Sequence, residues 1–237
     1  MSSPDAVTRS LELISRAERH GASLRMVGGV AIAYLCGSES RAADLDFVAG
    51  HKDRVAVESA MAEAGFASDR EFNHLHGHQR LYFEAPDGVP VDVFIGRMDM
   101  CHMLDLRARL QLFSPTVPPA DLALSKLQIV QFTEKDRRDT HALLERIEVT
   151  ERHDAIDPRR IGEVTSADWG WYQTVSQNLE RFATSSDVAG ARASSLVELI
   201  NSWPKSRRWN VRARVGTRKK WYRLPEEVAH GSLAGGG

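Results

Sequence analysis

The first half of the chain alternates between helical and strand-like patterns of hydrophobic residues. Apolar residues recur at helical spacing between 7 and 20, which predicts an amphipathic helix there. A short strand at 25–27 is stopped by the pair Gly28-Gly29, and an apolar helix follows over 30–35. Alternating positions and turn residues predict the other elements of this half, which are a strand at 44–48, a helix at 52–64, and strands at 73–84 and 89–95 joined by a turn at 85–88.

The second half is predicted to be mainly helical. Its expected helices cover 121–132, 134–147, about 169–182 and about 189–201. Asp121 is expected to cap the first of these helices, and Thr133 with Asp136 to form a capping box at the second. The dipeptide Asp157-Pro158 marks an expected boundary.

The order of the elements predicts an α/β (α+β) fold. A short mixed β-sheet flanked by helices would precede a mainly helical C-terminal part with a basic tail. We expect a catalytic core over 1–150 and a helical C-terminal region over 151–237, which contains a basic and aromatic segment at 203–223.

Composition narrows the class of protein. With 42% hydrophobic and 27% charged residues, the chain of 237 residues is typical of soluble globular proteins. No apolar run approaches the roughly 18 residues of a membrane span, and the first residues lack the basic start and apolar stretch of a secretory signal. Two cysteines, Cys36 and Cys101, are too few for a disulfide framework or a thiolate metal site. We therefore expect a cytoplasmic protein with no membrane partner.

Two carboxylates in the strand at 44–48 are the first candidates for chemistry. Residues two apart in a strand point to the same face, so Asp44 and Asp46 would lie side by side while Leu45 and Phe47 face the core. Such a pair repels itself unless a cation lies between the two groups. Oxygen ligands of this kind suit Mg²⁺ or Mn²⁺.

Two further features strengthen this interpretation. Asp92 interrupts the apolar strand at 89–95, and a buried lone carboxylate needs solvent, a partner or a metal. If that strand lies beside the first, three carboxylates converge, as a two-metal phosphoryl-transfer site requires. Gly28-Gly29 opens a helix and can bring bare backbone N–H groups to phosphates. Each motif alone occurs by chance or as a simple turn, and their order along the chain gives them weight.

These motifs resemble a known family. The stretches 27–31, 44–47 and 91–93 are similar to the glycine turn, the paired Asp and the third Asp of the DNA polymerase β-like nucleotidyltransferase superfamily. Downstream, the stretches 121–127 and 134–139 resemble the Lys motif and the Lys-Asp-X-X-Asp motif of AbiEii-type toxin nucleotidyltransferases, which include the MenT toxins. The resemblance covers roughly residues 20–150 and implies a polymerase β-like core.

The resemblance also implies a reaction and a set of residues. A nucleoside monophosphate would pass from a nucleoside triphosphate to an acceptor hydroxyl, with release of pyrophosphate. Members of the subgroup modify the 3′ end of tRNA or are suspected of similar chemistry, and an antitoxin protein neutralises them. The implied catalytic residues are Asp44, Asp46, Asp92 and Lys126, and the implied nucleotide-binding residues are Gly28, Gly29, Arg41, Lys126, Asp136 and Asp139.

Several of these assignments have an alternative. Lys126 lies in an apolar helical stretch and could simply extend to the surface. Asp136 and Asp139 fit an ordinary solvated helix start equally well, and Arg41 fits an ordinary loop. The chain also departs from the family at Val30, where many members have a hydroxyl residue close by, and at 42–43, where two alanines replace the Ser or Thr of many toxins.

The segment 203–223 differs sharply from the rest of the chain. It has nine Lys or Arg and no acidic residue, so the remainder carries a net charge of −10 within a total of −1. Interleaved Trp and basic residues are typical of a nucleic-acid surface, and alternation at 211–215 predicts a β-hairpin through Gly216. The candidate RNA contacts are Arg207, Arg208, Trp209, Arg212, Arg214, Lys219, Lys220 and Trp221. A solvated face packed on the acidic body and a dock for an acidic protein are the alternatives.

Other functions stay open at this stage. His74, His76 and His78 alternate and would share one face of the strand at 73–84, as an exposed face, a transition-metal site or the acceptor side of a cleft. The acceptor is expected to be RNA, and a small molecule such as an aminoglycoside is the alternative. A non-catalytic RNA-binding relative is a further alternative, which three mutually repelling acids argue against.

Overall fold

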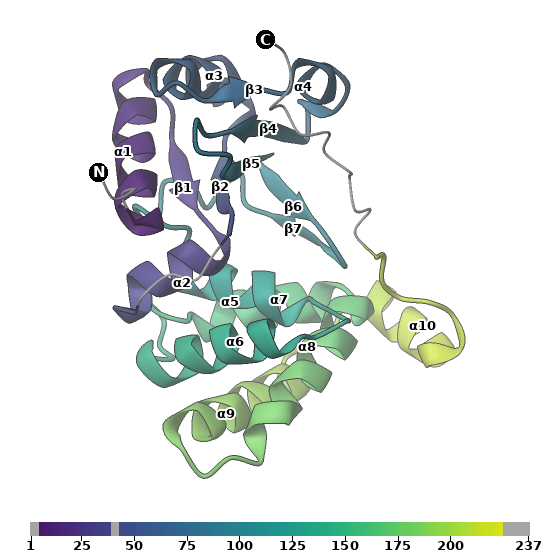
Figure 1. Cartoon of the computed structure of the whole chain (residues 1–237). Coiled ribbons are helices and arrows are strands. Elements are labelled where there is room, and N and C mark those ends of the chain that lie inside the picture. The colour runs from purple at the N-terminus through teal and green to yellow at the C-terminus, as the bar shows by residue number, and fades with distance from the viewer. Residues whose placement is uncertain (1–4, 39–42, 225–237) are drawn as a thin grey trace. The chain divides into compact units, whose positions relative to one another are not determined.

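The computed structural model describes residues 5–38 and 43–224 (Figure 1). These residues form two compact units. The first contains the described residues up to Met98 together with Asp105–Val117, and the second contains Asp99–Leu104 together with the described residues from Pro118 to Leu224. The expected core at 1–150 therefore covers the first unit and the first helices of the second, and its role as the catalytic core stays a prediction.

The first unit is built on a five-stranded mixed sheet with the order β1-β2-β5-β4-β3. Only β2 and β5 run parallel, and the other neighbours are antiparallel. The strands are β1 (Leu24–Met26), β2 (Leu45–Ala49), β3 (Ala67–Ser68), β4 (Arg80–Glu84) and β5 (Pro90–Ile95). Its helices are α1 (Ala6–Arg19), α2 (Gly28–Cys36), a 3₁₀ turn η1 (His51–Asp53), α3 (Arg54–Glu63) and α4 (Arg70–His76). The predicted mixed sheet flanked by helices is confirmed.

Buried and half-exposed side chains alternate at the start of β2, which gives the strand one face toward the core and one polar face. Leu45 and Phe47 are buried while Asp46 between them is half-exposed, so the predicted division of β2 into a core face and a polar face is confirmed. The turn between β4 and β5 is also as predicted, closed by a hydrogen bond from the Gly88 N–H to the Ala85 carbonyl. Beyond β5, the short strands β6 (Arg97–Asp99) and β7 (Met103–Asp105) pair with each other.

The second unit is helical, as predicted. It contains α5 (Pro119–Leu127), α6 (Glu134–Arg146), α7 (Pro158–Ala167), α8 (Trp169–Ala183), α9 (Val188–Ser202), α10 (Arg207–Val215) and a 3₁₀ turn η2 (Gly216–Arg218). Helix α8 packs on α5, α7 and α9, and α9 also packs on α6. The predicted capping box of Thr133 and Asp136 is present at the start of α6. None of the described helices combines the length and the apolar character that crossing a lipid bilayer requires.

Three local predictions were wrong. Asp121 does not cap α5, which begins at Pro119; its side chain is fully buried and pairs with Arg160 of α7 at 2.8 Å. The expected strand at 73–84 begins only at Arg80, because Asp69 caps α4 by accepting the Phe72 N–H.

The third error concerns the basic segment, where a helix replaces the predicted β-hairpin. Ser206 accepts the Trp209 N–H and starts α10, and Gly216 ends that helix with a φ of +58°. Valines at 211 and 215 are one helical turn apart, so their alternation with arginine fits a helix as well as a strand.

Candidate active site

Two aspartates of the first unit face each other across the parallel strands. Asp46 of β2 and Asp92 of β5 are directly paired in the ladder, so their side chains leave the sheet on the same face. Asp92 is only 8% exposed. A buried carboxylate beside another acid is stable only with cationic or hydrogen-bonding partners. Asp46 and Asp92, called the acidic pair below, therefore need a positively charged partner.

The backbone of Gly28 lies directly against this pair. Gly28 begins α2 with a φ of +68°, and a β-carbon added to it would overlap the carboxylate of Asp46. The preceding N–H, from Val27, donates to the carbonyl of Asp46 at 2.9 Å. Only glycine satisfies both the backbone conformation and the close approach. The first turn of α2, which also contains Gly29, thus begins beside Asp46.

The other two predicted site residues of this unit, Asp44 and Arg41, lie outside the strands of the sheet or outside the described residues. Asp44 lies in a bend just before β2, not in the strand itself, and its side chain is half-exposed. Its role as a third ligand stays a prediction. Arg41 lies outside the described residues.

Arg80 is the partner of Asp92, and the sequence pattern did not single it out. Its Nε donates to Asp92 Oδ1 at 2.6 Å from the neighbouring strand β4, and its guanidinium lies over the ring of Phe94. Burial alone would lower the pKa of Arg80, but the hydrogen bond to Asp92 and the charges of Asp92 and Asp46 raise it above its ordinary value. Arg80 is therefore a permanent positive charge at the acidic pair.

These residues fit a divalent cation. Asp46 and Asp92 offer hard oxygen ligands from adjacent strands, and Mg²⁺ commonly takes one or two carboxylates with substrate phosphates. The carboxylate of Asp46 occupies the space that a β-carbon at position 28 would need, so it lies directly against the backbone at the start of α2. Asp46, Asp92 and the predicted third ligand Asp44 are the residues that would hold Mg²⁺ or Mn²⁺.

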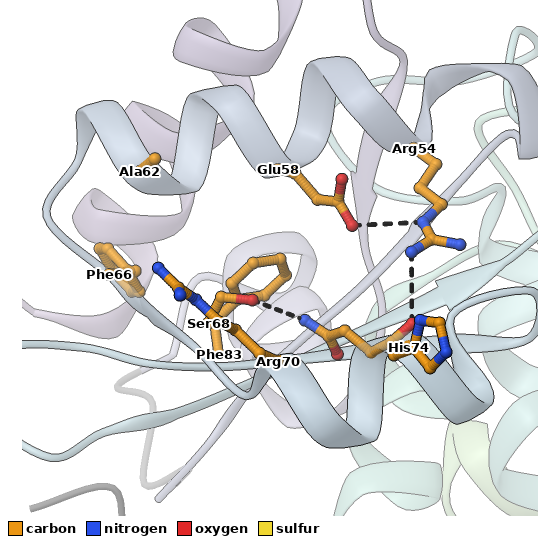
Figure 2. Close-up of a pocket in the computed structure, with 9 residues that line it drawn as sticks. Arg54, Glu58, Ala62, Phe66, Ser68, Arg70, His74 and Phe83 are labelled. Atoms are coloured by element: carbon orange, nitrogen blue, oxygen red, sulfur yellow. Dashed lines mark hydrogen bonds and ion pairs between the residues drawn. The ribbon is translucent and has the colours of Figure 1, made fainter.

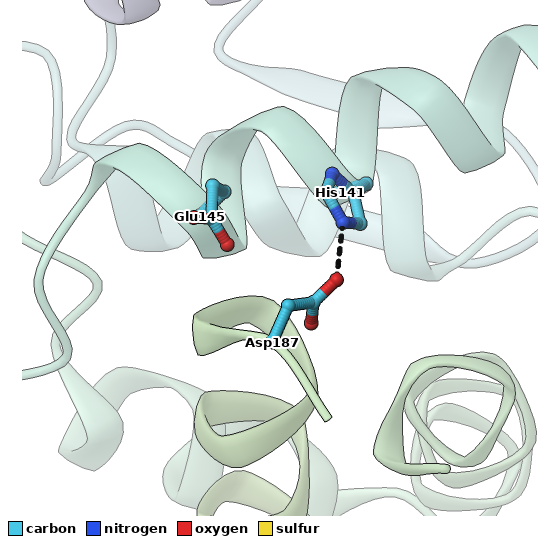
Figure 3. Close-up of side chains that lie close together, drawn as sticks. All are labelled: His141, Glu145 and Asp187. Atoms are coloured by element: carbon cyan, nitrogen blue, oxygen red, sulfur yellow. Dashed lines mark hydrogen bonds and ion pairs between the residues drawn. The ribbon is translucent and has the colours of Figure 1, made fainter. Parts of the chain in front are cut away.

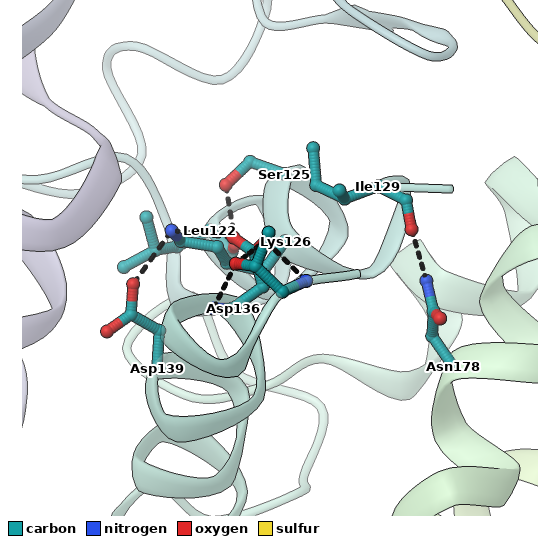
Figure 4. Close-up of polar contacts among 8 residues, drawn as sticks. Leu122, Ser125, Lys126, Ile129, Asp136, Asp139 and Asn178 are labelled. Atoms are coloured by element: carbon teal, nitrogen blue, oxygen red, sulfur yellow. Dashed lines mark hydrogen bonds and ion pairs between the residues drawn. The ribbon is translucent and has the colours of Figure 1, made fainter. Parts of the chain in front are cut away.

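Lys126, in the second unit, forms a charged cluster with two aspartates of α6 (Figure 4). Its Nζ lies 2.7 Å from Asp139 Oδ2 and 3.4 Å from Asp136 Oδ1, and its side chain is 12% exposed. Burial alone would lower the pKa of Lys126, but Asp139 and then Asp136 raise it above its ordinary value. The structure thus brings together the three residues of the two downstream motifs. Lys126 does not extend freely into solvent.

The basic segment forms a groove on the second unit. A cavity of about 710 Å³ is lined by Arg207, Arg208, Val211, Arg212, Val215, Lys219 and Lys220, called the basic groove below. Arg214 is exposed on the same helix.

The two tryptophans that were candidate RNA contacts are used for packing. Trp209 meets Tyr172 edge to face, and Trp221 packs on Trp169 and donates its Nε1–H to Thr174. Arg212 is also engaged, because it donates to the carbonyls of Gly216 and Lys219. The exposed cations among the candidate RNA contacts, which a ligand could reach, are Arg207, Arg208, Arg214, Lys219 and Lys220.

The three alternating histidines do not share a strand face. His74 and His76 belong to α4, while His78 follows it and contacts the side chain of Gln79. His74 lines a cavity of about 330 Å³ between α3 and α4, together with Arg54 and Glu58, which are hydrogen-bonded to each other (Figure 2). The geometry expected for a histidine metal site on a strand is therefore absent from these residues.

Comparison with known proteins gives distant structural matches only. No protein-family model matches the chain, and no curated protein matches its sequence.

Solved structures do match. The antibiotic-resistance factor ANT(2'')-Ia is similar over 57% of this chain and 80% of its own, with 13% identity and a TM-score of 0.42. An antigenic nucleotidyltransferase-like protein from Paracoccidioides brasiliensis is similar over 87% of this chain and 96% of its own, with 14% identity and a TM-score of 0.44. The CCA-adding enzyme of Thermotoga maritima, solved with tRNA, is similar over 82% of this chain and 51% of its own, with 16% identity and a TM-score of 0.31. Similarity at this level leaves the function of the chain to the chemistry of its own residues.

Proposed function

We propose that this chain is a metal-dependent nucleotidyltransferase. The observation that carries the proposal is the direct pairing of Asp46 with Asp92, with the backbone of Gly28 held against the Asp46 carboxylate. Two adjacent carboxylates repel each other and lower the stability of the fold unless a cation lies close to them. A helix that begins beside them offers backbone N–H groups to phosphate. Carboxylates for a metal next to N–H groups for phosphate are the two needs of nucleotidyl transfer.

In the proposed reaction, an acceptor hydroxyl oxygen forms a bond to the α-phosphorus of a nucleoside triphosphate. The bond from that phosphorus to the bridging oxygen breaks, pyrophosphate leaves, and the hydroxyl proton passes to solvent. Bound Mg²⁺ or Mn²⁺ would offset the charge on the reacting oxygens. The chain's own residues position the reactants: Asp44, Asp46 and Asp92 hold the cation, and Gly28 and Gly29 receive phosphate through backbone N–H groups.

Lys126 is proposed to bind the nucleotide. Its two carboxylate neighbours keep it charged despite its burial, which is what a phosphate-binding lysine requires. Asp136 and Asp139 are proposed to hold this lysine in place and to support the nucleotide or the acceptor.

The proposed acceptor is RNA, most specifically the 3′ end of tRNA, and the biological role is that of the toxin in a toxin–antitoxin pair of the AbiEii/MenT type. The basic groove supports an RNA acceptor, because its Arg and Lys side chains can neutralise several phosphates. RNA binding through these charges is expected to weaken steeply with salt, which a titration of tRNA affinity between low and high salt would measure.

The decisive experiment is incubation of the protein with total RNA and each labelled nucleoside triphosphate in turn, with Mg²⁺. We expect labelled RNA from the wild type and none from Asp46→Asn. Asp154→Asn is the matched control, since it removes an equivalent charge from an exposed side chain whose ion pair is with Arg152, between α6 and α7.

Three outcomes would change the proposal. Full activity in a folded Asp46→Asn variant overturns the assignment of the site. Label on an added aminoglycoside and none on RNA replaces the acceptor with a small molecule. RNA binding without transfer of any nucleotide supports a non-catalytic RNA-binding protein.

A further inference from the structure

A second group of metal-ligating side chains lies in the helical unit, on residues to which the proposed reaction assigns no role. His141 and Glu145 are one turn apart on the same face of α6, and Asp187 stands at the start of α9 (Figure 3). Each offers one ligand atom, and the three atoms lie within 4.8 Å of one another.

The separation of the ligand atoms suits a small tetrahedral cation. His141 Nε2 lies 3.0 Å from Asp187 Oδ2. Ligand atoms at the Zn–N and Zn–O distances of zinc sites lie about 3.3 Å from each other in tetrahedral geometry. At 3.0 Å the two atoms are hydrogen-bonded to each other, and a bound ion would replace this contact. Glu145, four residues after His141, is placed to supply the third.

Hydrogen bonds from the backbone hold both carboxylates. Asp187 Oδ1 accepts the Gly190 N–H at 2.8 Å, and Glu145 Oε2 accepts the Ala189 N–H at 3.1 Å. In metal sites, hydrogen bonds of this kind fix the direction of the ligating groups. Each carboxylate still has an oxygen that does not accept these N–H groups. Arg192 ties the two helices together by donating to the carbonyls of Leu144 and Glu145, so the ligands sit on a fixed frame.

We propose that His141, Glu145 and Asp187 form a site for a transition-metal ion of the zinc class, with water as the fourth ligand. An imidazole with two carboxylates favours Zn²⁺ over Mg²⁺, which prefers oxygen ligands alone. The bound ion cross-links α6 to α9. Since α6 also carries Asp136 and Asp139, the ion stabilises the helix whose aspartates pair with Lys126 of α5. The site does not depend on the proposed nucleotidyl transfer.

The test is calorimetric titration of the metal-free full chain with Zn²⁺, together with visible absorption of the Co²⁺ form, whose intensity reports tetrahedral coordination. We expect Zn²⁺ to bind the wild type and to raise its Tm. His141→Ala is expected to weaken binding at this site at least tenfold and to remove the rise in Tm. Glu145→Gln serves as the second variant, because glutamine keeps an oxygen for the Ala189 N–H while losing the charge.

Two controls separate this site from others on the chain. His153→Ala removes an exposed histidine of the same unit and is expected to leave Zn²⁺ binding unchanged. Asp46→Asn alters the acidic pair in the other unit and is also expected to leave Zn²⁺ binding at His141, Glu145 and Asp187 unchanged. Zn²⁺ affinity equal to that of the wild type in both His141→Ala and Glu145→Gln overturns the proposal. Absence of Zn²⁺ binding by the wild type also overturns it, and the His141–Asp187 contact is then an ion pair at the start of α9.

Discussion

Replacing Gly28 with alanine tests whether the acidic pair binds metal. Gly28 has a φ of +68°, a conformation that costs a residue with a side chain roughly 1–2 kcal/mol. We expect Gly28→Ala to lower the free energy of unfolding by at least that amount. The added β-carbon would also overlap the carboxylate of Asp46, so this side chain has to move. If Asp46 is a ligand, its displacement lowers the affinity for the cation.

Gly21→Ala is the matched control for this experiment. Gly21 also has a positive φ, of +80°, but a β-carbon there meets nothing within 4 Å. It therefore carries the backbone cost without the overlap. Urea unfolding and calorimetric titration with Mn²⁺ are measured for both variants. We expect comparable losses of stability from the backbone, and a loss of about 10–100-fold in Mn²⁺ affinity in Gly28→Ala alone, the range found when residues that orient metal ligands are changed.

Two results would refute this reasoning. A folded Gly28→Ala variant that binds Mn²⁺ like the wild type would show that Asp46 is not a ligand or that it is not displaced. An equal loss of affinity in Gly21→Ala would show that general destabilisation, and not the contact with Asp46, weakens binding.

Three further predictions concern charged or buried groups. Arg80→Gln removes the cation that pairs with Asp92, so urea unfolding of the metal-free protein is expected to show a loss of about 1–3 kcal/mol in the free energy of unfolding. Saturating Mn²⁺ is expected to raise the stability of this variant more than that of the wild type. Unchanged stability of the metal-free variant would contradict this. Lys126→Met is expected to destabilise by about 1–3 kcal/mol and to raise the KM for nucleoside triphosphate, while Lys135→Met, at an exposed lysine nearby, does neither. Burial lowers the pKa of His102 from 6.5 to about 4. The unfolded chain therefore takes up this proton first, and stability is expected to fall by about 3 kcal/mol at most as the pH drops from 6.5 to 4; His102→Gln should flatten that part of an acid-unfolding curve.

The sequence predicted that Asp46 and Asp92 meet on condition that their strands are neighbours, which the sheet confirms, but it did not predict Arg80 as the partner of Asp92. Alternation around Asp46 and the apolar run around Asp92 both show on which face a strand carries its carboxylate, and a strand has only two faces. Arg80 pairs with Asp92 across two antiparallel strands, and that contact depends on their register. Register follows from the length and geometry of the turn, which the local pattern of hydrophobic residues does not specify.

Capping decided the elements that were predicted wrongly. The three alternating histidines and the valines of the basic segment both follow a period of two, which favours a strand. In both places a polar residue just upstream, Asp69 or Ser206, accepts a backbone N–H and starts a helix. A short stretch of alternation is a weaker signal than a satisfied helix start, since helix nucleation is the costly step.

The balance of charge at the acidic pair bears on how the cation would bind. Asp46 and Asp92 contribute two negative charges and Arg80 returns one positive charge within hydrogen-bonding distance of Asp92. Arg80 therefore stabilises the metal-free state and lowers the net attraction for a cation. Because Mg²⁺ usually completes its coordination with substrate phosphates, we expect the nucleotide to supply the negative charge that Arg80 offsets. Affinity for Mn²⁺ should then be weak in the protein alone and rise when nucleoside triphosphate is present, and it should rise less in Arg80→Gln, where the carboxylates are no longer offset. Equal enhancement by nucleotide in both proteins, measured by the same titration, would show that Arg80 does not control metal binding.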